Sequence, residues 1–366
     1  MQLGSFMDRN MGQTELNSLL LQPDDLILIT GASGFIGSRL VQILLDRGFR
    51  NLRCFVRASG KMTHLRDIAS RYIGARIELL RGNLLSRVDC ENATKDVAVI
   101  YHLAAARGEK SVPDAFMNSV VTTRNLMEAA LLYQTLRRFV NVSSFAVYTN
   151  QTKRRRRVLD ETCATEKQPE TAGDAYCFAK VKQEEIVTEY GKSYGMPYVI
   201  VRPGYVYGPG NPGISGRVGI NLFGLFLHLG GPNPIPFTYV DNCAQAIALA
   251  GLKTGVDGEV FNVVDDELPS SREFLRLYKK NVGRFTSVYI PHVFSYALCY
   301  LWERYSAWSK GQLEPVYNRK KWHAYWKKTR YSNHKVKAAL GWTPTVPMTE
   351  GLRRYFQACR GTESNA

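Results

Sequence analysis

The sequence lacks the cysteine pattern of a disulfide-stapled or zinc-binding protein. Its seven cysteines are scattered along 366 residues, and none belongs to a Cys-x-x-Cys pair. An odd number of scattered thiols argues against a disulfide framework and fits a reducing compartment. We therefore expect a cytoplasmic protein with no bound metal.

Long apolar runs are also absent. No uninterrupted apolar stretch reaches about 18 residues, so the sequence predicts no membrane-spanning helix. Residues 1–24 have neither a basic start nor an apolar stretch of signal-peptide length, and we expect them to form a mobile N-terminal arm.

Acidic residues are scarce beside basic ones, at 32 against 48, which gives a formal net charge of +16. Part of the excess lies in three clusters, Lys153–Arg157, Arg319–Lys321 and Lys327–Arg330. Such clusters attract phosphorylated ligands or anionic lipid, or simply form a solvated surface. We expect no nucleic-acid partner, because no aromatic-interleaved recognition motif accompanies the charge. Peripheral contact with the inner face of an anionic membrane stays open.

The most informative stretch is an apolar run, Asp25–Thr30, that stops at three spaced glycines. Gly31 permits a tight turn, Gly34 lets the backbone approach a pyrophosphate, and Gly37 lets the following helix pack on the strand. The N-terminus of that helix offers N–H groups to phosphates. The pattern predicts a dinucleotide-binding turn between a strand and a helix.

Further along, apolar strands alternate with helical patterns of ten or more residues, which predicts a doubly wound parallel α/β sheet of the Rossmann type. We expect the dinucleotide-binding domain over 25–205 and a small, mostly C-terminal substrate-binding lobe over 206–358. The lobe should be interleaved with the last strands of the sheet, and 359–366 should form a tail.

A tyrosine and a lysine four residues apart, Tyr176 and Lys180, fall on one face of a predicted helix. A free phenol is a poor base at neutral pH, and an ammonium beside it favours the phenolate. Tyr176 could then exchange a proton with a carbinol or carbonyl oxygen while a nicotinamide moves a hydride. Ser144, at the end of the preceding strand, would donate a hydrogen bond to the same oxygen.

The second strand ends at Val56 and is followed by Arg57, with no acidic residue nearby. An acid at this place accepts from the adenosine ribose, whereas an arginine accommodates a 2′-phosphate. The sequence therefore favours NADP over NAD.

Taken together, these motifs resemble the extended short-chain dehydrogenases/reductases of the NAD-dependent epimerase/dehydratase superfamily, over about residues 25–358. The resemblance rests on the glycine turn, the Tyr176/Lys180 pair and five further segments: His102–Ala105, Val142–Tyr148, Arg202–Gly210, Tyr239–Asn242 and Leu340–Pro344.

By this resemblance, Ser144, Tyr176 and Lys180 form the catalytic triad, and the protein is a homodimer. The resemblance and the turn together give these cofactor-binding residues: Gly31, Ser33, Gly34, Phe35, Ile36, Gly37, Arg57, Asn83, Leu84, Leu103, Ala104, Ala105, Tyr176, Lys180 and Pro203. Arg202 is expected beside Pro203 at the cofactor. Asn83 stands where the family more often has an aspartate.

Two departures narrow the chemistry. Phe145 and Ala146 occupy the places of the Asp-Glu pair of sugar-nucleotide 4,6-dehydratases, so elimination of water is not expected. Ile235–Phe237 replaces an Arg-Asp-Phe segment whose arginine meets nucleotide phosphates in related enzymes. The Tyr239–Asn242 segment instead resembles the 3β-hydroxysteroid dehydrogenase and dihydroflavonol-reductase branch.

The aromatic segment Tyr289–Tyr305 has three interpretations: a core helix of the small lobe, which we favour, a helix on a membrane surface, or a wall of a lipid-like pocket.

The leading function is an NAD(P)-dependent oxidoreductase acting on a secondary alcohol or ketone of a small, hydrophobic, sterol-like molecule. The alternatives are a nucleotide-sugar epimerase of polysaccharide synthesis and a non-catalytic dinucleotide sensor, against which the intact triad argues.

Overall fold

The computed structural model describes residues 19–60, 62–105, 111–149, 158–171, 174–222, 224–309 and 318–363. Most of the predicted N-terminal arm, the basic cluster 153–157 and the end of the predicted tail therefore lie outside the described residues.

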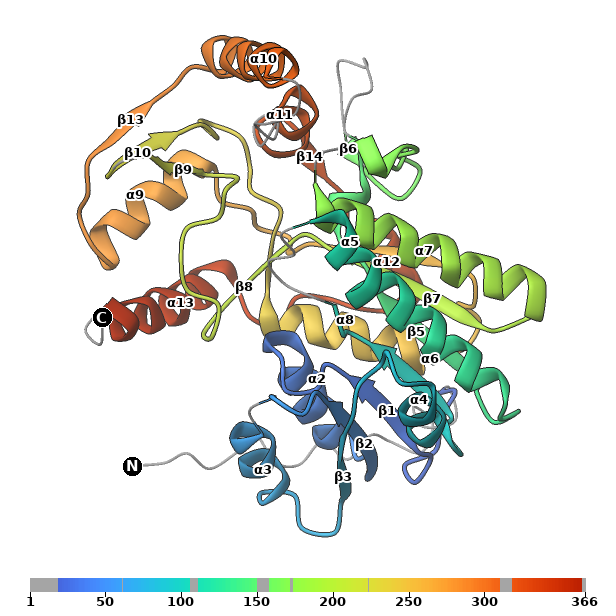
Figure 1. Cartoon of the computed structure of the whole chain (residues 1–366). Helices are drawn as coiled ribbons and strands as arrows, with labels where there is room; N and C mark the ends of the chain where they lie inside the picture. Colours follow the sequence, from blue (N-terminus) through green and yellow to red (C-terminus); the bar gives the residue numbers. More distant parts are fainter. Residues whose placement is uncertain are drawn as a thin grey trace, which may run out of the picture.

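The main sheet has seven parallel strands in the order β12-β7-β5-β4-β1-β2-β3 (Figure 1). Its strands are β1 (Ile27–Thr30), β2 (Asn51–Val56), β3 (Arg76–Arg81), β4 (Val99–His102), β5 (Arg138–Val142), β7 (Tyr198–Pro203) and β12 (Val260–Val263). The chain runs outward from β1 through β2 to β3 and then returns to β4 on the other side of β1. This reversal between β1 and β4 is the place where doubly wound sheets bind ligands, at the carboxyl ends of the strands. The predicted fold class is confirmed.

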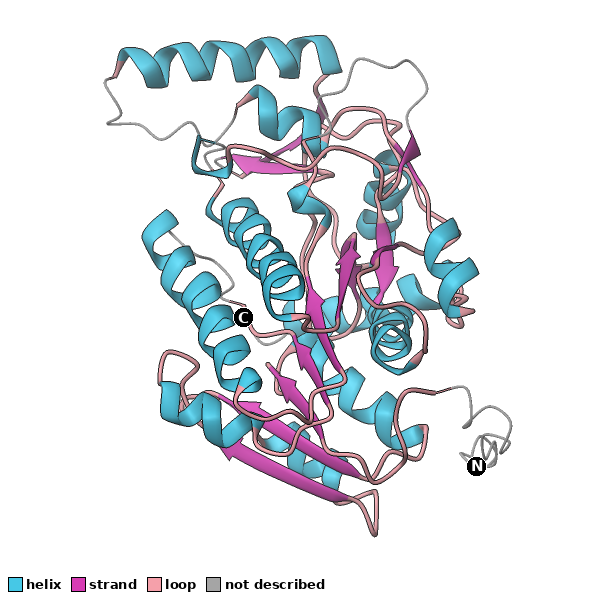
Figure 2. Cartoon of the chain, turned by 90° about the vertical axis from the view of Figure 1, so that its right-hand side faces the viewer, coloured by secondary structure: helices cyan, strands magenta, loops and turns pink. Residues whose placement is uncertain are grey.

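Alternate residues of the central strand β1 face two separate cores, because side chains alternate across a strand. Ile27 and Ile29 belong to the larger core, and Leu28 belongs to the other one. Helices α2 (Phe35–Asp46) and α8 (Val240–Leu252) cover the first face. Helices α4 (Arg87–Thr94), α6 (Thr122–Leu131) and α7 (Ala175–Tyr194) cover the second. Figure 2 shows the strands between these layers of helices.

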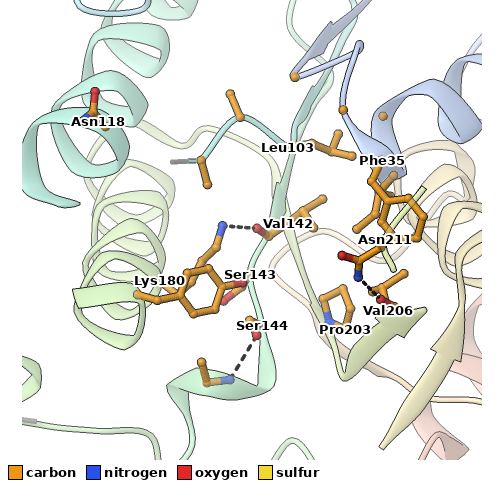
Figure 3. Close-up of a pocket in the computed structure, with 18 of the residues that line it drawn as sticks. Phe35, Leu103, Asn118, Val142, Ser143, Ser144, Lys180, Pro203, Val206 and Asn211 are labelled. Atoms are coloured by element: carbon orange, nitrogen blue, oxygen red, sulfur yellow. Dashed lines mark hydrogen bonds between the residues drawn. The ribbon is translucent and has the colours of Figure 1, made fainter. Parts of the chain in front are cut away.

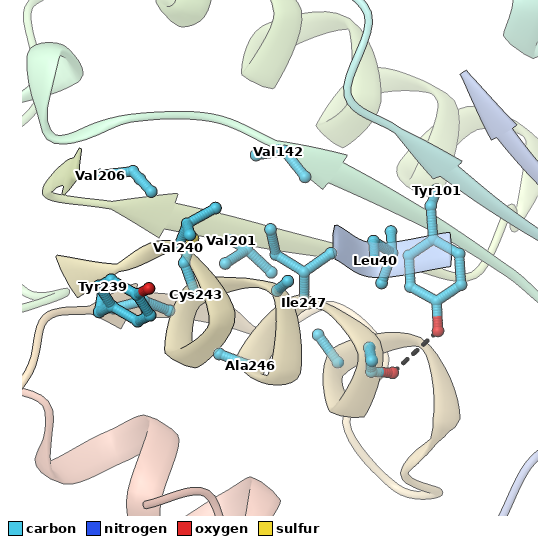
Figure 4. Close-up of a cluster of buried hydrophobic side chains, with 14 of the residues drawn as sticks. Leu40, Tyr101, Val142, Val201, Val206, Tyr239, Val240, Cys243, Ala246 and Ile247 are labelled. Atoms are coloured by element: carbon cyan, nitrogen blue, oxygen red, sulfur yellow. Dashed lines mark hydrogen bonds between the residues drawn. The ribbon is translucent and has the colours of Figure 1, made fainter. Parts of the chain in front are cut away.

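The larger core is dense where α8 crosses the sheet. Ile247 is fully buried on α8, as are Leu40 of α2 and Tyr101 of β4. The Tyr101 hydroxyl donates to the carbonyl of Ala248 at 2.8 Å, so the one polar group of that ring has a partner inside the core (Figure 4).

The helical segment between β4 and β5 contains a wider turn. Helix α5 (Val112–Ala115) passes into a π-helical segment, η1 (Phe116–Val121), before α6 begins. A π-helical turn inserts an extra residue and is frequent at functional sites.

A smaller lobe is built mainly from the chain after β7. It contains a three-stranded sheet, β13-β10-β9, and two strand pairs, β11-β8 and β14-β6. Its strands are β6 (Val158–Leu159), β8 (Tyr205–Tyr207), β9 (Gly219–Leu222), β10 (Leu225–His228), β11 (Phe237–Tyr239), β13 (Ser287–Tyr289) and β14 (Arg330–Tyr331). Between β11 and β13 the chain returns to the main sheet to form α8 and β12.

The remaining helices are short or belong mostly to this lobe. They are α3 (Thr63–Ala69), η2 (Phe145–Val147), η3 (Pro169–Thr171), α9 (Ser271–Asn281), α10 (His292–Trp308), α11 (Arg319–Tyr325), α12 (His334–Leu340) and α13 (Met348–Glu363). Helix α10 lies at the top edge of the molecule in Figures 1 and 2. Most of its side chains are exposed, so the favoured interpretation of 289–305 as a core helix is wrong.

Candidate active site

A cavity of about 840 Å³ opens at the carboxyl ends of the central strands, beside the reversal between β1 and β4. Sixteen of the residues predicted as catalytic or cofactor-binding border it: Gly31, Ser33, Gly34, Phe35, Ile36, Gly37, Arg57, Asn83, Leu84, Leu103, Ala104, Ala105, Ser144, Tyr176, Lys180 and Pro203. The structure therefore brings them to one place, while their individual roles stay predictions.

The glycine turn forms one end of this cavity. At two of its positions, a residue larger than glycine would clash with the backbone. Gly31 has a φ of +69°, and a Cβ there would lie 3.0 Å from the backbone nitrogen of Ala104. A Cβ on Gly37 would lie 2.2 Å from the carbonyl oxygen of Gly31. Gly34 caps α2 without a side chain, so the helix N-terminus faces the cavity uncovered. This cradle fits the diphosphate of a dinucleotide.

Past β2, the cavity is lined by Arg57, Ser59 and Gly60, and past β3 by Asn83 and Leu84. The Asn83 side-chain oxygen accepts from the Leu85 amide at 3.0 Å, so this amide also shapes its own turn. No carboxylate lines this end of the cavity among the described residues.

Tyr176 and Lys180 are set by the start of α7. The carboxylate of Asp174 accepts from the backbone amides of Tyr176 and Cys177, both at 3.0 Å, and so caps the helix. Tyr176 is 39% exposed, whereas Lys180 is 4% exposed, with its Nζ 6.0 Å from the centre of the tyrosine ring.

The Lys180 ammonium is held by two acceptors. Its Nζ donates to the carbonyl of Val142 at 2.8 Å (Figure 3). It also donates to Oε1 of Gln183 at 3.0 Å. The Ser144 hydroxyl follows β5 and accepts from the amide of Ala146 at 3.2 Å. Carbonyl and amide acceptors keep the lysine oriented without neutralising its charge.

Behind Lys180 lies a buried polar chain that the sequence does not reveal. Gln183 donates to Thr123 at 2.8 Å, and His102 is hydrogen-bonded to Thr123 at 2.9 Å and to Thr30 at 2.8 Å. Burial and the nearby Lys180 charge lower the pKa of His102 to about 3. His102 is therefore neutral at physiological pH and adds no second positive charge beside Lys180.

The cavity also contains residues that sequence reasoning missed. Asn118 enters it from the π-helical segment η1, and Arg217 and Tyr325 enter from the lobe. The Arg217 guanidinium lies 5.0 Å from the Tyr325 ring centre and donates to the carbonyl of Ala324 at 2.8 Å. The only signal for Arg217 in the sequence is its place shortly after the glycine-proline loop 207–213.

Arg202 does not lie where the sequence led us to expect it. Pro203 lines the cavity, but the buried Arg202 guanidinium turns to Glu184, with two hydrogen bonds of 2.6 and 2.8 Å, and to the Tyr148 hydroxyl at 2.8 Å. A buried arginine needs such a partner, because an unpaired charge inside a protein is costly. Arg202 thus joins α7 to β7 and does not line the cavity.

The fold and the cavity together define a dinucleotide-binding protein of the Rossmann type. Its Ser/Tyr/Lys set lies at the end of the cavity where a nicotinamide is expected. The family comparison agrees, since residues 27–263 match the model of the NAD dependent epimerase/dehydratase family. The chain belongs to this family, whose members are enzymes.

Among curated relatives, cinnamoyl-CoA reductase 1 of Oryza sativa subsp. japonica is 32% identical over 188 residues, which is 50% of this chain and 54% of the reductase. The chain thus spans about half the length of the cinnamoyl-CoA reductases that it matches. The uncharacterized UDP-glucose epimerase YtcB of Bacillus subtilis is 27% identical over 70% of this chain and 82% of that protein.

Among solved structures, UDP-glucuronic acid 4-epimerase from Bacillus cereus in complex with NAD has a TM-score of 0.68 at 22% identity. The match covers 92% of this chain and 99% of that chain. At this identity the likeness shows a shared fold.

Two further findings concern the described residues as a whole. No helix in the described part of the chain is long and apolar enough to cross a membrane. Within the same residues, no cluster of three or more His, Cys, Asp or Glu side chains could hold a metal ion.

Proposed function

We propose that the protein moves a hydride between a nicotinamide dinucleotide and a hydroxyl-bearing carbon of a substrate linked to a nucleoside diphosphate, as nucleotide-sugar epimerases do. The observation that carries this proposal is the charge of the cavity. Its charged lining residues are Arg57, Lys180 and Arg217, and no carboxylate lines it among the described residues. An all-positive cavity suits a phosphorylated cofactor and a phosphorylated substrate.

The dinucleotide, when bound on the glycine turn, supplies the hydride acceptor and donor. Tyr176 removes the proton of the substrate hydroxyl as the carbon loses its hydride, and it returns a proton when the keto group is reduced. Lys180 holds positive charge beside the phenol, and Ser144 donates to the reacting oxygen. In an epimerase the hydride returns to the other face of the carbon, so the reaction has no net redox change.

The sequence lacks the phosphate-binding arginine that related enzymes have before Tyr239. In our proposal Arg217 makes the contact with the substrate phosphate instead. Its stacking on Tyr325 and its bond to Ala324 fix the guanidinium at the lobe side of the cavity. A planar guanidinium presents two N–H groups to one phosphate. Both UDP-sugars and coenzyme A thioesters, named for the relatives above, contain a diphosphate, so either class agrees with this assignment.

Dehydration is not part of the proposal. Phe145 and Ala146 follow Ser144 and line the cavity, in the places where a 4,6-dehydratase has its acid pair. Without a carboxylate at these two places, the cavity lacks the acid and base pair that eliminates water in a 4,6-dehydratase.

A second candidate is the net reduction of a hydrophobic ketone, or the net oxidation of the corresponding secondary alcohol, which is the leading interpretation from the sequence. The aromatic side chains of Phe145, Tyr205 and Tyr325 favour it, because they form part of the cavity wall. The two candidates differ in cofactor use: a reductase consumes free NADPH or NADH, whereas an epimerase retains its dinucleotide.

The test is to denature the purified protein, identify the released dinucleotide, and then incubate the holoenzyme with UDP-glucose, UDP-glucuronic acid and dTDP-glucose. Conversion to the C4 epimer without a change at 340 nm supports the proposal. A cofactor-free protein that oxidises NADPH only with hydrophobic ketones would refute it in favour of the second candidate. A sensor would be indicated if neither class of substrate were turned over and if Tyr176→Phe released the same dinucleotide as the wild type.

Cofactor preference is tested with Arg57→Ala. We propose that Arg57 favours a 2′-phosphate, so the variant should lose about tenfold in affinity for NADPH and little for NADH. Equal losses for both would refute the NADP preference. The predicted homodimer is checked on the same samples by sedimentation.

A further inference from the structure

Helix α10 exposes its large apolar side chains, whereas a core helix would bury them. The three buried side chains of His292–Trp308 are small: Ser295, Cys299 and Ser306. The exposed ones are large: Val293, Phe294, Tyr296, Leu298, Tyr300, Leu301, Trp302, Tyr305 and Trp308. Soluble monomers rarely expose apolar groups in such a contiguous set, and such patches mark interaction surfaces.

The orientation of α10 is fixed by polar and aromatic contacts with α11. Trp322 donates through Nε1 to the Ser295 hydroxyl at 2.8 Å, and its ring lies edge-on to Tyr296 at 5.1 Å. Glu303 pairs with Arg319 at 2.7 Å. These contacts use Ser295, Tyr296 and Glu303, and they leave the side chains of Phe294, Leu298, Leu301 and Trp308 facing outward.

The stretch of sequence that contains α10 is strongly basic. Within 271–330 the sequence has 13 Lys and Arg against 3 Asp and Glu, so this segment carries +10 of the chain's +16. On α10 itself the one carboxylate, Glu303, is paired, and Arg304 is exposed. Whatever covers this face must be apolar in its interior and negatively charged at its surface.

We propose that α10 lies in the interface of an anionic lipid bilayer, parallel to its plane, on the face defined by Phe294, Leu298, Leu301 and Trp308, with the three aliphatic and phenyl side chains among the acyl chains and Trp308 at the headgroup level. Tryptophan and tyrosine prefer the headgroup level, and neighbouring lysines and arginines attract anionic lipid. With 17 residues the helix is about 25 Å long, too short to cross the bilayer.

A second copy of the chain is the competing occupant, and charge argues against it. A symmetric contact through α10 would place two segments of +10 against each other, and like charges close together oppose association. A bilayer containing anionic lipid offers the opposite sign over the whole surface. The proposal is independent of the proposed function, since no residue of α10 lines the catalytic cavity.

The experiment is sedimentation of the full chain with sucrose-loaded vesicles of phosphatidylcholine alone or mixed 7:3 with phosphatidylglycerol, at 0.1 M NaCl. The test variant is Leu301→Glu/Trp308→Glu. The matched control is Leu132→Glu/Ile73→Glu, which places the same charges at exposed apolar positions far from α10 in the sequence.

We expect at least tenfold stronger partitioning onto the phosphatidylglycerol vesicles than onto phosphatidylcholine alone, a tenfold or greater loss in the α10 variant, and no loss in the control. Circular dichroism and cofactor content show that each variant is folded. Three outcomes would overturn the proposal. They are no binding to either vesicle, binding that the α10 variant leaves unchanged, and a vesicle-free dimer that this variant dissociates, which would assign the face to a second copy.

Discussion

Helices α8 and α10 are both rich in apolar residues, yet the fold treats them in opposite ways. In α8, eleven of 13 residues are buried between the main sheet and its neighbours. In α10, three of 17 are buried, and all three are small. Apolar composition alone therefore does not determine burial. What differs is the partner: α8 crosses a seven-stranded sheet, whereas α10 packs mainly on one short helix of the lobe, α11.

The same division runs through the cavity, where we propose that the sheet side performs the chemistry and the lobe side recognises the substrate. Ser144, Tyr176 and Lys180 come from elements of the main sheet, whereas Arg217 and Tyr325 come from the lobe. If this comparison holds, substitutions on the sheet side should lower turnover or stability. Substitutions on the lobe side should weaken substrate binding or leave the fold intact. The following predictions test it in order of decreasing effect.

The largest effect is expected for Tyr176→Phe. Loss of the phenolic proton should lower kcat by about 10²-fold or more, because no other side chain replaces this acid and base. The measurement is steady-state turnover of the substrate found among the nucleotide sugars. Tyr194→Phe, at the exposed far end of the same helix, is the matched control and should keep full turnover. Equal losses in both variants would mean that α7 is merely disturbed.

On the sheet side, Ile247→Ala should destabilise the protein by about 3 kcal/mol, since it removes a fully buried aliphatic side chain and leaves a cavity. Urea unfolding followed by circular dichroism measures the loss. A change below about 1 kcal/mol would show that the α8 side of the core relaxes freely and would weaken the comparison with α10.

Acid should destabilise the sheet side through His102. Its pKa falls from 6.5 to about 3 on folding, so below pH 6.5 the unfolded chain binds a proton that the folded chain refuses. Stability is therefore retained above pH 6.5 and lost as the pH falls toward 3, by about 2 kcal/mol at pH 5.

The measurement compares urea unfolding of wild type and His102→Gln at pH 7 and pH 5. Other groups, such as Asp265, whose pKa burial raises to about 7, titrate in both proteins and cancel in the difference. If the two proteins lose the same stability between these pH values, His102 is not the acid-sensitive group.

The sequence was sufficient for the local parts of the site. The glycine turn, Ser144 and the Tyr176/Lys180 pair are encoded by short spacings, and each lies directly at the end of a strand or the start of a helix. Since parallel strands end at one edge of the sheet, placing the strands also placed these residues.

Residues that depend on distant contacts were not predictable in this way. Arg217 is oriented by a bond to Ala324, 107 residues later in the chain. Asn118 reaches the cavity from a π-helical turn, which has no reliable sequence pattern. The exposure of α10 likewise depends on what packs beside it, and the order of its apolar residues in the sequence does not reveal that.

On the lobe side of the cavity, Arg217→Gln should raise KM for the nucleotide sugar about tenfold and change kcat less than threefold. The arginine would contact a phosphate remote from the reacting carbon, so its loss removes binding that is equal in ground and transition states. The control is Arg276→Gln on α9, which does not line the cavity. A fall in kcat with an unchanged KM would move Arg217 to the chemical step and break the division between sheet and lobe.

The smallest effect is expected for Leu301→Ala, the counterpart of Ile247→Ala on the exposed helix. Leu301 is 61% exposed, so its truncation removes little buried area and should change stability by less than about 0.5 kcal/mol. Urea unfolding under the conditions used for Ile247→Ala measures it. A loss comparable to that of Ile247→Ala would mean that α10 is covered in the free protein, by a second copy or another segment of the chain. Its apolar face would then stabilise the fold as α8 does.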